Sequence, residues 1–307
     1  MKLEAKDLVK SFGEKQVLRE VSLSISSGGA LGLLGRNGAG KTTAIRIIMG
    51  IFPADSGRVL VDGAPIRRRD LRIGYMPEER GLYPRQVIMD QLCYLGELQG
   101  MKRQRVKRRA LELLRRLNLE DAAGRKLETL SKGNQQKVQL VATLLNDPDI
   151  VVLDEPFSGL DPVNASLLKK EVARLIEDGK LLFFSSHQMH YVEEFCDQIA
   201  ILNAGKIVLS GSLKGIKRGY DRRRVLLAGA QMREAEIFLR EHGSAWAEKV
   251  ERRSDAPGAP LCVTLRAEEQ KAELLNALLV RRVDLDRFEV YEPTLNEIFV
   301  RYTEGGI

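Results

Sequence analysis

The glycine-rich string GRNGAGKTT, at residues 35–43, restricts the fold of this chain more than any other feature. An apolar run at residues 30–34 precedes it and is short enough for a buried strand. The residues that follow place apolar side chains at helical spacing: Ala44, Ile47, Ile48 and Ile51. Glycines between a strand and a helix predict a tight turn with backbone conformations that other residues avoid. The chain is therefore expected to have an α/β fold built on strand–turn–helix units.

This turn has the chemistry of a phosphate-binding site. Gly35, Gly38 and Gly40 allow several backbone N–H groups to point into one concavity, at the positive end of the following helix. The spacing GxxxxGK followed by Thr predicts that Lys41 reaches the β- and γ-phosphates of a nucleoside triphosphate and that Thr42 binds Mg²⁺. The rest of the string is predicted to line the same nucleotide: Arg36, Asn37, Ala39 and Thr43. A glycine turn that binds nothing is the alternative, which the flanking strand and helix disfavour.

The composition is that of a globular protein with a sizeable core. The 307 residues, 44% of them hydrophobic, suffice for one large domain or two ordinary ones. No long apolar run occurs, and the start MKLEAKDLVKSF lacks the apolar core of a signal peptide, so the chain itself is expected neither to span nor to cross a membrane. Three isolated cysteines, Cys93, Cys196 and Cys262, favour neither a disulfide framework nor a metal knuckle, and they fit a reducing cytoplasm.

The net charge of +7 is concentrated in three stretches, at residues 66–72, 101–117 and 221–225. Such stretches face nucleic acid in some proteins and anionic lipid in others, or they are solvated helix faces. The second stretch has the pattern of a solvated helix, because its apolar residues share one face: Val106, Ala110, Leu113, Leu114 and Leu117. The stretches by themselves leave all three interpretations open.

A second apolar run ends in two carboxylates. Residues 149–161, DIVVLDEPFSGLD, have the pattern of a buried parallel strand that ends at Asp154 and Glu155. Ligands of such sheets lie at the carboxyl ends of strands, so Asp154 is expected to hold Mg²⁺ through water and Glu155 to polarise a water aimed at the γ-phosphate. Two acids that merely cap a strand before Pro156 are the alternative.

A third strand is predicted in LLFFSSHQM, at residues 181–189, with His187 just beyond its end. An isolated histidine is more often a surface or core residue than a catalytic one. Its place at the carboxyl end of a strand nevertheless favours a role at the nucleotide.

A Ser-Lys-Gly turn precedes a predicted helix in LETLSKGNQQKVQLVATLL, at residues 127–145. The helix has an apolar face made of Val138, Val141, Leu144 and Leu145. Ser131 has the pattern of an N-cap. The Ser131 hydroxyl and the Gly133 N–H, at a helix N-terminus, would also make a clamp for a γ-phosphate.

Taken together, these motifs resemble the nucleotide-binding subunit of an ABC transporter. The string GRNGAGKTT, the signature LSKGNQQ in place of the usual LSGGQ, the strand end VVLDEP, the loop SGLD and the histidine of SSHQM follow one another in the order of that family. The resemblance covers residues 1 to about 215. It implies an α/β fold of the P-loop NTPase (ABC ATPase) type, with a helical subdomain at about residues 80–147.

The resemblance also implies how the site residues act. Phe12 would stack on the adenine of ATP, with a place in the core as the alternative. Two subunits would enclose two ATP molecules with Mg²⁺, so that Ser131, Gly133 and Gln135 bind the ATP of the opposite subunit. Asp161 would lie at the dimer seam, Glu155 would act as general base, and His187 would contact the γ-phosphate.

One position departs from the family pattern. Members of the family usually carry a glutamine that contacts Mg²⁺ or the attacking water and couples to the membrane partner, and RIGYMPEERGLYPRQ places Glu78 there. A carboxylate adds negative charge near the triphosphate, which disfavours the nucleotide unless Mg²⁺ or an arginine such as Arg80 compensates. Glu78 is thus a candidate ligand of both nucleotide and metal. The strings PEERGLYP and DEPFSGLDPVN resemble a bacterial exporter branch of the sodium-extrusion type.

The pattern changes after a hairpin-like segment, NAGKIVLSGS, at residues 203–212. The remaining segments predict the order β-α-β-β-α-β, a split βαβ arrangement. We therefore expect two domains, a nucleotide-binding domain at residues 1–220 and a small α+β accessory domain at 221–307. The final EPTLNEIFVRYTEGG resembles the carboxyl end of many exporter ATPase subunits.

The leading hypothesis is an ATP-hydrolysing subunit that drives a membrane exporter. Its expected partners are multi-span permease subunits and a second nucleotide-binding subunit, in a homodimer or a heterodimer, with no direct contact to nucleic acid. Its expected place is cytoplasmic, peripheral on the inner face of the membrane. The alternatives are a soluble ABC-type ATPase that acts on nucleic acid or ribosomes and a regulator that does not hydrolyse. A single phosphate loop argues against the first, and the presence of Glu155 and the signature argues against the second.

Overall fold

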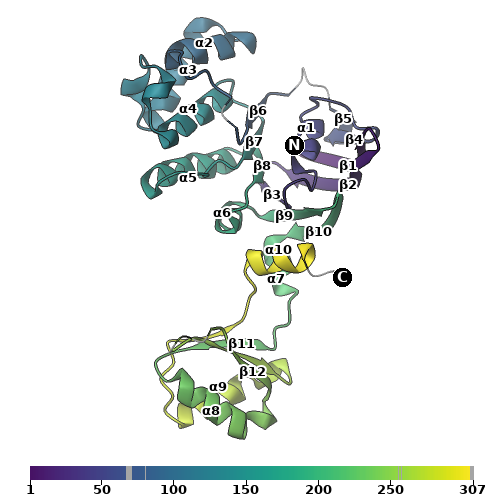
Figure 1. The fold of residues 1–307 in the computed structure, drawn as a ribbon, viewed down its shortest axis with the longest axis vertical. Helices are drawn as coiled ribbons and strands as arrows, with labels where there is room; N and C mark the ends of the chain where they lie inside the picture. The colour runs from purple at the N-terminus through teal and green to yellow at the C-terminus, as the bar shows by residue number, and fades with distance from the viewer. Residues whose placement is uncertain (67–70, 80, 255, 257, 305–307) are drawn as a thin grey trace. The chain divides into compact units, whose positions relative to one another are not determined.

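The computed structural model describes residues 1–66, 71–79, 81–254, 256 and 258–304 (Figure 1). The chain forms two compact units. The first contains Met1–Leu213 together with the chain from Leu295 onward, and the second contains Lys214–Thr294. Among the described residues, no helix has both the length and the apolar character needed to cross a membrane.

A six-stranded sheet forms the centre of the first unit. Its strand order is β10-β9-β3-β8-β7-β6, with only β10 antiparallel to its neighbour. The strands are β3 (Ala30–Leu34), β6 (Ile73–Met76), β7 (Ile150–Asp154), β8 (Leu181–Ser185), β9 (Gln198–Asn203) and β10 (Lys206–Ser212). Every residue of β3, β7 and β8 is buried, because helices and a second sheet cover them. All the carboxyl ends of the parallel strands lie at one edge.

The second sheet of this unit is antiparallel, in the order β2-β1-β4-β5. Its strands are β1 (Lys2–Phe12), β2 (Lys15–Ser26), β4 (Ser56–Val61) and β5 (Ala64–Pro65). Apolar side chains from both sheets and from helix α1 (Lys41–Ile48) share one core, which includes Leu3, Leu18, Ile48 and Phe183.

Helix α1 ends earlier than the apolar spacing predicts. Gly50 has a φ of 63°, and the N–H of Ile51 donates to the carbonyl of Arg46 at 2.8 Å while the N–H of Gly50 donates to Ile47 at 2.7 Å. These two bonds close the helix in a Schellman motif. Ile51 therefore lies outside the helix with 52% of its surface exposed, and its assignment to the apolar face was wrong.

Three helices lie between β6 and β7, in the stretch predicted to be a helical subdomain. They are α2 (Ile88–Leu98), α3 (Arg103–Arg116) and α4 (Lys132–Leu144), with short 3₁₀ turns at Glu120–Ala122 and Leu127–Thr129. The predicted apolar face of residues 106–117 is confirmed, since all five side chains are buried. On the outer side, Arg103 pairs with Glu97 and Arg115 with Glu120. The arginines at 67–69 lie outside the described residues.

Two further helices follow the central strands. Helix α5 (Pro162–Glu177) comes after β7, and α6 (Met189–Phe195) comes after β8. The predicted hairpin of β9 and β10 is confirmed, and Ala204 and Gly205 at its turn both have positive φ. Helix α7 (Leu213–Arg218) follows β10.

The second unit has the predicted order β-α-β-β-α-β. It consists of β11 (Arg224–Ala228), α8 (Met232–His242), β12 (Ala247–Arg252), β13 (Leu261–Leu265), α9 (Lys271–Val280) and β14 (Arg287–Val290), with 3₁₀ turns at Gly243–Ala245 and Glu268–Gln270. Its antiparallel sheet has the order β12-β13-β11-β14. Both helices contribute to a core of their own with the sheet, through residues such as Leu239, Leu274 and Val263.

The last helix, α10 (Leu295–Thr303), returns to the first unit. Its apolar residues Leu295 and Ile298 are fully buried, and the N–H of Leu295 donates to the Glu193 carboxylate in α6 at 2.7 Å. Asn203 in β9 donates to the Tyr302 carbonyl at 3.3 Å. The compact second unit is therefore shorter than the expected domain at 221–307, because the final amphipathic helix buries its apolar face against the first unit.

Candidate nucleotide site

The strand order places the predicted site residues in one row. The phosphate loop follows β3, His187 follows β8, Asp154 ends β7 with Glu155 directly after it, and Glu78 follows β6. These four parallel strands are consecutive neighbours in the sheet. Their carboxyl ends therefore bring together residues that are up to 152 positions apart in the sequence, at the edge where ligands of α/β sheets bind.

Glycine is required at two positions of the phosphate loop. Gly38 has a φ of 79° and Gly40 a φ of 110°, both in the region that side chains disfavour. A Cβ at Gly40 would also lie only 2.8 Å from Leu18 Cδ2 and 3.0 Å from the Val17 carbonyl. Gly40 thus brings the start of α1 close to β2 and leaves the first N–H groups of the helix directed at the loop.

The other residues of the loop differ in exposure. Arg36, Asn37 and Thr42 are exposed, Gly35 and Thr43 are half-buried, and Ala39 is buried. The Ala39 N–H donates to the Arg36 carbonyl at 3.0 Å, which closes the turn. The Lys41 Nζ donates to the Gly35 carbonyl at 2.6 Å, so the ammonium group lies over the loop where the predicted phosphates would bind.

Three carboxylates act on the Lys41 ammonium group. Burial lowers the pKa of Lys41, and the charges of Asp154, Glu155 and Glu78 act in the opposite direction. Asp154 and Glu155 at the end of β7 and Glu78 after β6 lie at the same edge of the sheet as the loop that follows β3. Glu78, the residue that departs from the family pattern, therefore lies at the sheet edge where the site is predicted, and Arg80 lies outside the described residues.

Glu155 is held in place by the strand next to its own. It has a φ of 50°, and its N–H donates to the Ser185 carbonyl at 2.9 Å. Its Oε1 accepts from the His187 N–H at 2.7 Å, and its Oε2 accepts from the Ser186 hydroxyl at 3.0 Å. Only 7% of the residue is exposed. The carboxylate is thus buried and held in one orientation by the end of the neighbouring strand.

His187 lies on the solvent side of this carboxylate. Its Nδ1 is 2.8 Å from Glu155 Oε1, and 70% of the side chain is exposed. The ring is therefore oriented by Glu155 while the Nε2 side remains open to a ligand.

Asp154 is the carboxylate that the sequence predicts to hold Mg²⁺. The residue is 8% exposed and lies at the end of β7. Burial raises the pKa of the neighbouring Tyr75 hydroxyl, and the charge of Asp154 raises it further. No group of three His, Cys, Asp or Glu side chains suited to a metal occurs among the described residues. Mg²⁺ beside a triphosphate takes most of its ligands from phosphate and water, so one carboxylate with the Thr42 hydroxyl fits this ion.

The signature turn begins helix α4. The Ser131 Oγ accepts from the Asn134 N–H at 3.3 Å, which confirms the N-cap, and the residue is exposed. Gln135 donates to the Leu130 carbonyl at 2.9 Å and so braces the same turn. Gly133 is buried against the start of α5, where an added Cβ would lie 3.1 Å from Asn164 Nδ2.

Asp161 caps helix α5. Its Oδ1 accepts from the backbone N–H groups of Val163 and Asn164, both at 3.0 Å. Hydrogen bonds from the backbone N–H and the side-chain amide of Asn164 are the main reason that the pKa of Asp161 is lowered. Val163 is 73% exposed, which is unusual for a large apolar side chain. The contribution of these residues to a dimer seam stays a prediction.

Phe12, predicted to stack on adenine, ends β1 and is 53% exposed. Its ring packs edge-on against Phe52 with a centroid distance of 5.9 Å, and the Lys10 Nζ lies 5.6 Å from its centroid. An exposed aromatic ring in this position is available for stacking, and a place in the core is excluded.

Three supporting residues were missed by the sequence analysis. Ser186 donates to Glu155, Gln136 donates to the carbonyls of Glu155 and Pro156, and Gln139 donates to those of Pro77 and Glu79. The spacing of Gln136 and Gln139, one helical turn apart, places them on one face of the predicted helix but does not indicate which groups they contact.

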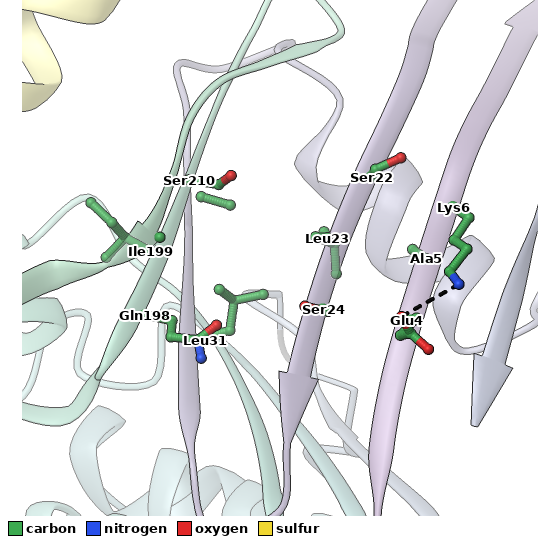
Figure 2. Close-up of a pocket in the computed structure, with 12 residues that line it drawn as sticks. Glu4, Ala5, Lys6, Ser22, Leu23, Ser24, Leu31, Gln198, Ile199 and Ser210 are labelled. Carbon is green, nitrogen blue, oxygen red and sulfur yellow. Dashed lines mark ion pairs between the residues drawn. The ribbon is translucent and has the colours of Figure 1, made fainter. Parts of the chain in front are cut away.

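A separate cavity of about 330 Å³ lies near the amino end of β3 (Figure 2). It is lined by Leu31, Gln198 and Ser210 on one side and by Glu4 and Lys6 on β1. The Glu4 carboxylate is already paired with Lys2 and Lys6, at 3.2 and 3.5 Å. The cavity contains none of the predicted site residues and is not the nucleotide site.

Four features define a P-loop nucleotide-binding protein: strand β3, the glycine loop after it, Lys41, and the acids at the end of β7. Residues 18–158 match the ABC transporter family, and residues 211–303 match the C-terminal domain of ATP-binding proteins like DrrA1-3. The ABC transporter ATP-binding protein YhaQ of Bacillus subtilis (strain 168) is 39% identical over 297 residues, covering 95% of each chain. The linearmycin resistance ATP-binding protein LnrL of the same organism is 30% identical over 311 residues, covering 98% of each.

Solved structures agree with this result. The structure of an ATP-binding subunit of an ABC transporter superposes with a TM-score of 0.65 at 31% identity, covering 71% of this chain and 92% of that one. The chain therefore belongs to the ATP-binding proteins of ABC transporters. The predicted P-loop fold of the ABC ATPase type is confirmed, and the protein is an ATPase that binds ATP. Subunits of this family dimerise and work with membrane permease subunits.

Proposed function

We propose that this protein hydrolyses ATP between two nucleotide-binding subunits and so drives export by a multi-span permease at the inner face of the membrane. The ATPase part of this proposal rests on one observation. Lys41, His187 and Glu155 lie in a row beyond the ends of the neighbouring strands β3, β8 and β7. The same row supplies a phosphate-binding cation, a ring that faces the γ-phosphate and a buried base. Mg²⁺, held by Thr42 and Asp154, would neutralise charge on the phosphates when bound.

The exposed start of α5 supports a dimer. Pro162 and Val163 directly follow Asp161, all three are exposed, and Leu160 next to them is half-buried. In a dimer these apolar side chains would be covered by the second subunit, which removes them from water. The exposed Ser131 hydroxyl begins α4, which contacts α5, so both elements are available to a second subunit.

The helices after Glu78 support contact with a permease. Tyr83, Tyr94 and Leu98 are 56, 51 and 66% exposed, and the Gln91 side chain of α2 holds the backbone of Tyr83. Tyr83 lies five positions after Glu78. Exposed aromatic and aliphatic side chains of this kind suit contact with an amphipathic helix from a membrane subunit. LnrL is named for linearmycin resistance, which agrees with an export role.

Co-purification tests this proposal. The tagged protein is expected to isolate a multi-span membrane protein from detergent-solubilised membranes, and nuclease treatment should not change the result. A variant with Tyr94→Ser and Leu98→Ser is expected to lose this partner and to retain ATP hydrolysis. Recovery of ribosomal proteins, or of partners lost on nuclease treatment, would overturn the exporter proposal in favour of a nucleic-acid-associated ATPase.

The carboxylate of Glu78 gives a separate prediction. Glu78→Gln removes one negative charge from the surroundings of Lys41, so ATP affinity is expected to stay equal or become tighter, by up to about threefold for an exposed charge. Equilibrium binding of a fluorescent ATP analogue measures this. A large loss of affinity would show that the carboxylate contributes directly to binding, and Glu79→Gln, at the exposed neighbouring position, is the control.

A further inference from the structure

Polar side chains along one side of helix α4 face the loop that follows β6, with Glu78, and the loop that follows β7, with Glu155. Gln136, Gln139 and Thr143 are spaced by three and four residues and therefore lie on one side of the helix. Gln139 and Thr143 are buried, and Gln136 is half-buried. Buried polar side chains are retained where they satisfy groups that have no other partner.

Each glutamine holds one loop. Gln139 Nε2 is 2.8 Å from the Pro77 carbonyl and 3.4 Å from the Glu79 carbonyl, which lie on either side of Glu78. Gln136 Nε2 is 2.7 Å from the Pro156 carbonyl and 3.2 Å from the Glu155 carbonyl. A primary amide carries two N–H donors, so each side chain is suited to two carbonyls.

The loops need these donors because their strands have ended. β6 ends at Met76 and β7 at Asp154, so the carbonyls that follow have left the sheet ladder between these two strands. Pro77 and Pro156 have no N–H and interrupt regular backbone bonding at the same places. Thr143 continues the stripe, since its hydroxyl lies 3.3 Å from the Tyr75 carbonyl in β6.

We infer that α4 sets the position of Glu78 through Gln139 and that of Glu155 through Gln136. Gln139 is thus a positioning residue for the carboxylate that departs from the family pattern. Because Ser131 and Gly133 begin the same helix, a displacement of the signature turn would reach both loops of its own subunit. This inference rests on the proposed function, in which these loops face ATP.

A double-mutant cycle with Gln139→Leu and Glu78→Ala tests it. Leucine fills a similar volume without a donor. In the wild-type background we expect Gln139→Leu to lower kcat for ATP by about tenfold, as is usual for a supporting residue, with less change in KM. In the Glu78→Ala background the same substitution is expected to change kcat by less than about twofold, because no carboxylate remains to be positioned. Equal losses in both backgrounds would overturn the inference.

Two measurements separate positioning from stability. Gln91→Leu is the matched control, because Gln91 is also buried and donates to two loop carbonyls, those of Tyr83 and Gln86, at 3.4 Å each. Both variants are expected to lower the melting temperature, but only Gln139→Leu should lower kcat and alter ATP binding measured at equilibrium with and without Mg²⁺. If Glu155→Gln also left hydrolysis unchanged, the proposed function would fail. If Glu155→Gln lowered hydrolysis as expected but the effects of Gln139→Leu and Glu78→Ala on kcat were additive, this inference alone would fail.

Discussion

Glu155→Gln is expected to lower the rate of ATP hydrolysis by about 10²- to 10⁴-fold and to leave ATP binding intact. The amide keeps the shape of the side chain and one acceptor for the His187 N–H, which lies 2.7 Å from the carboxylate. It cannot accept a proton from water. Steady-state hydrolysis and equilibrium binding of ATP measure the two effects, and unchanged hydrolysis would reject Glu155 as the general base.

The same variant should accumulate a dimer. If ATP closes two subunits together and hydrolysis separates them, Glu155→Gln is expected to elute as a dimer in ATP and as a monomer without it. Glu171→Gln is a matched control, because Glu171 is 5% exposed and paired with Arg116 and Arg174 away from the nucleotide. We expect that control to lose thermal stability and to keep its hydrolysis rate.

Lys41→Met is expected to weaken ATP binding by about 10- to 100-fold, which corresponds to the roughly 1.5–3 kcal/mol of a hydrogen bond to a charged group. The methionine keeps most of the aliphatic stem and removes the ammonium group that lies 2.6 Å from the Gly35 carbonyl. It also leaves the carboxylates of Asp154, Glu155 and Glu78 without their cation, so they would repel the phosphates.

Titration calorimetry with ATP measures this loss. Lys170→Met, which removes an exposed positive charge from α5, controls for the change in net charge and should bind ATP as the wild type does. Similar affinities for both variants would show that the loop holds phosphates through its backbone N–H groups alone. Because burial lowers the pKa of Lys41, the wild-type affinity should also fall at alkaline pH sooner than an ordinary lysine would predict.

The motifs of this protein could be predicted because they depend on short-range pattern. The apolar run before the phosphate loop, the N-cap at Ser131 and the strand end at Asp154 are each specified within about ten residues. Even the juxtaposition of Lys41, Glu155 and His187 was accessible, because carboxyl ends of parallel strands share one edge. The end of α1 was misjudged, since the left-handed Gly50 outweighed the apolar spacing that continued to Ile51.

The loops, the caps and the family thus follow from local sequence pattern, whereas the surfaces that cover one another depend on packing between distant segments. An amphipathic pattern shows that Leu295 and Ile298 must be buried but does not say against which partner, and packing assigned α10 to the first unit, with Glu193 bonded to its first N–H. Likewise, no local pattern reveals that Gln139 faces carbonyls about 60 positions away in the sequence. The reason is physical: burial and unsatisfied backbone groups create a requirement that only neighbours in space can meet.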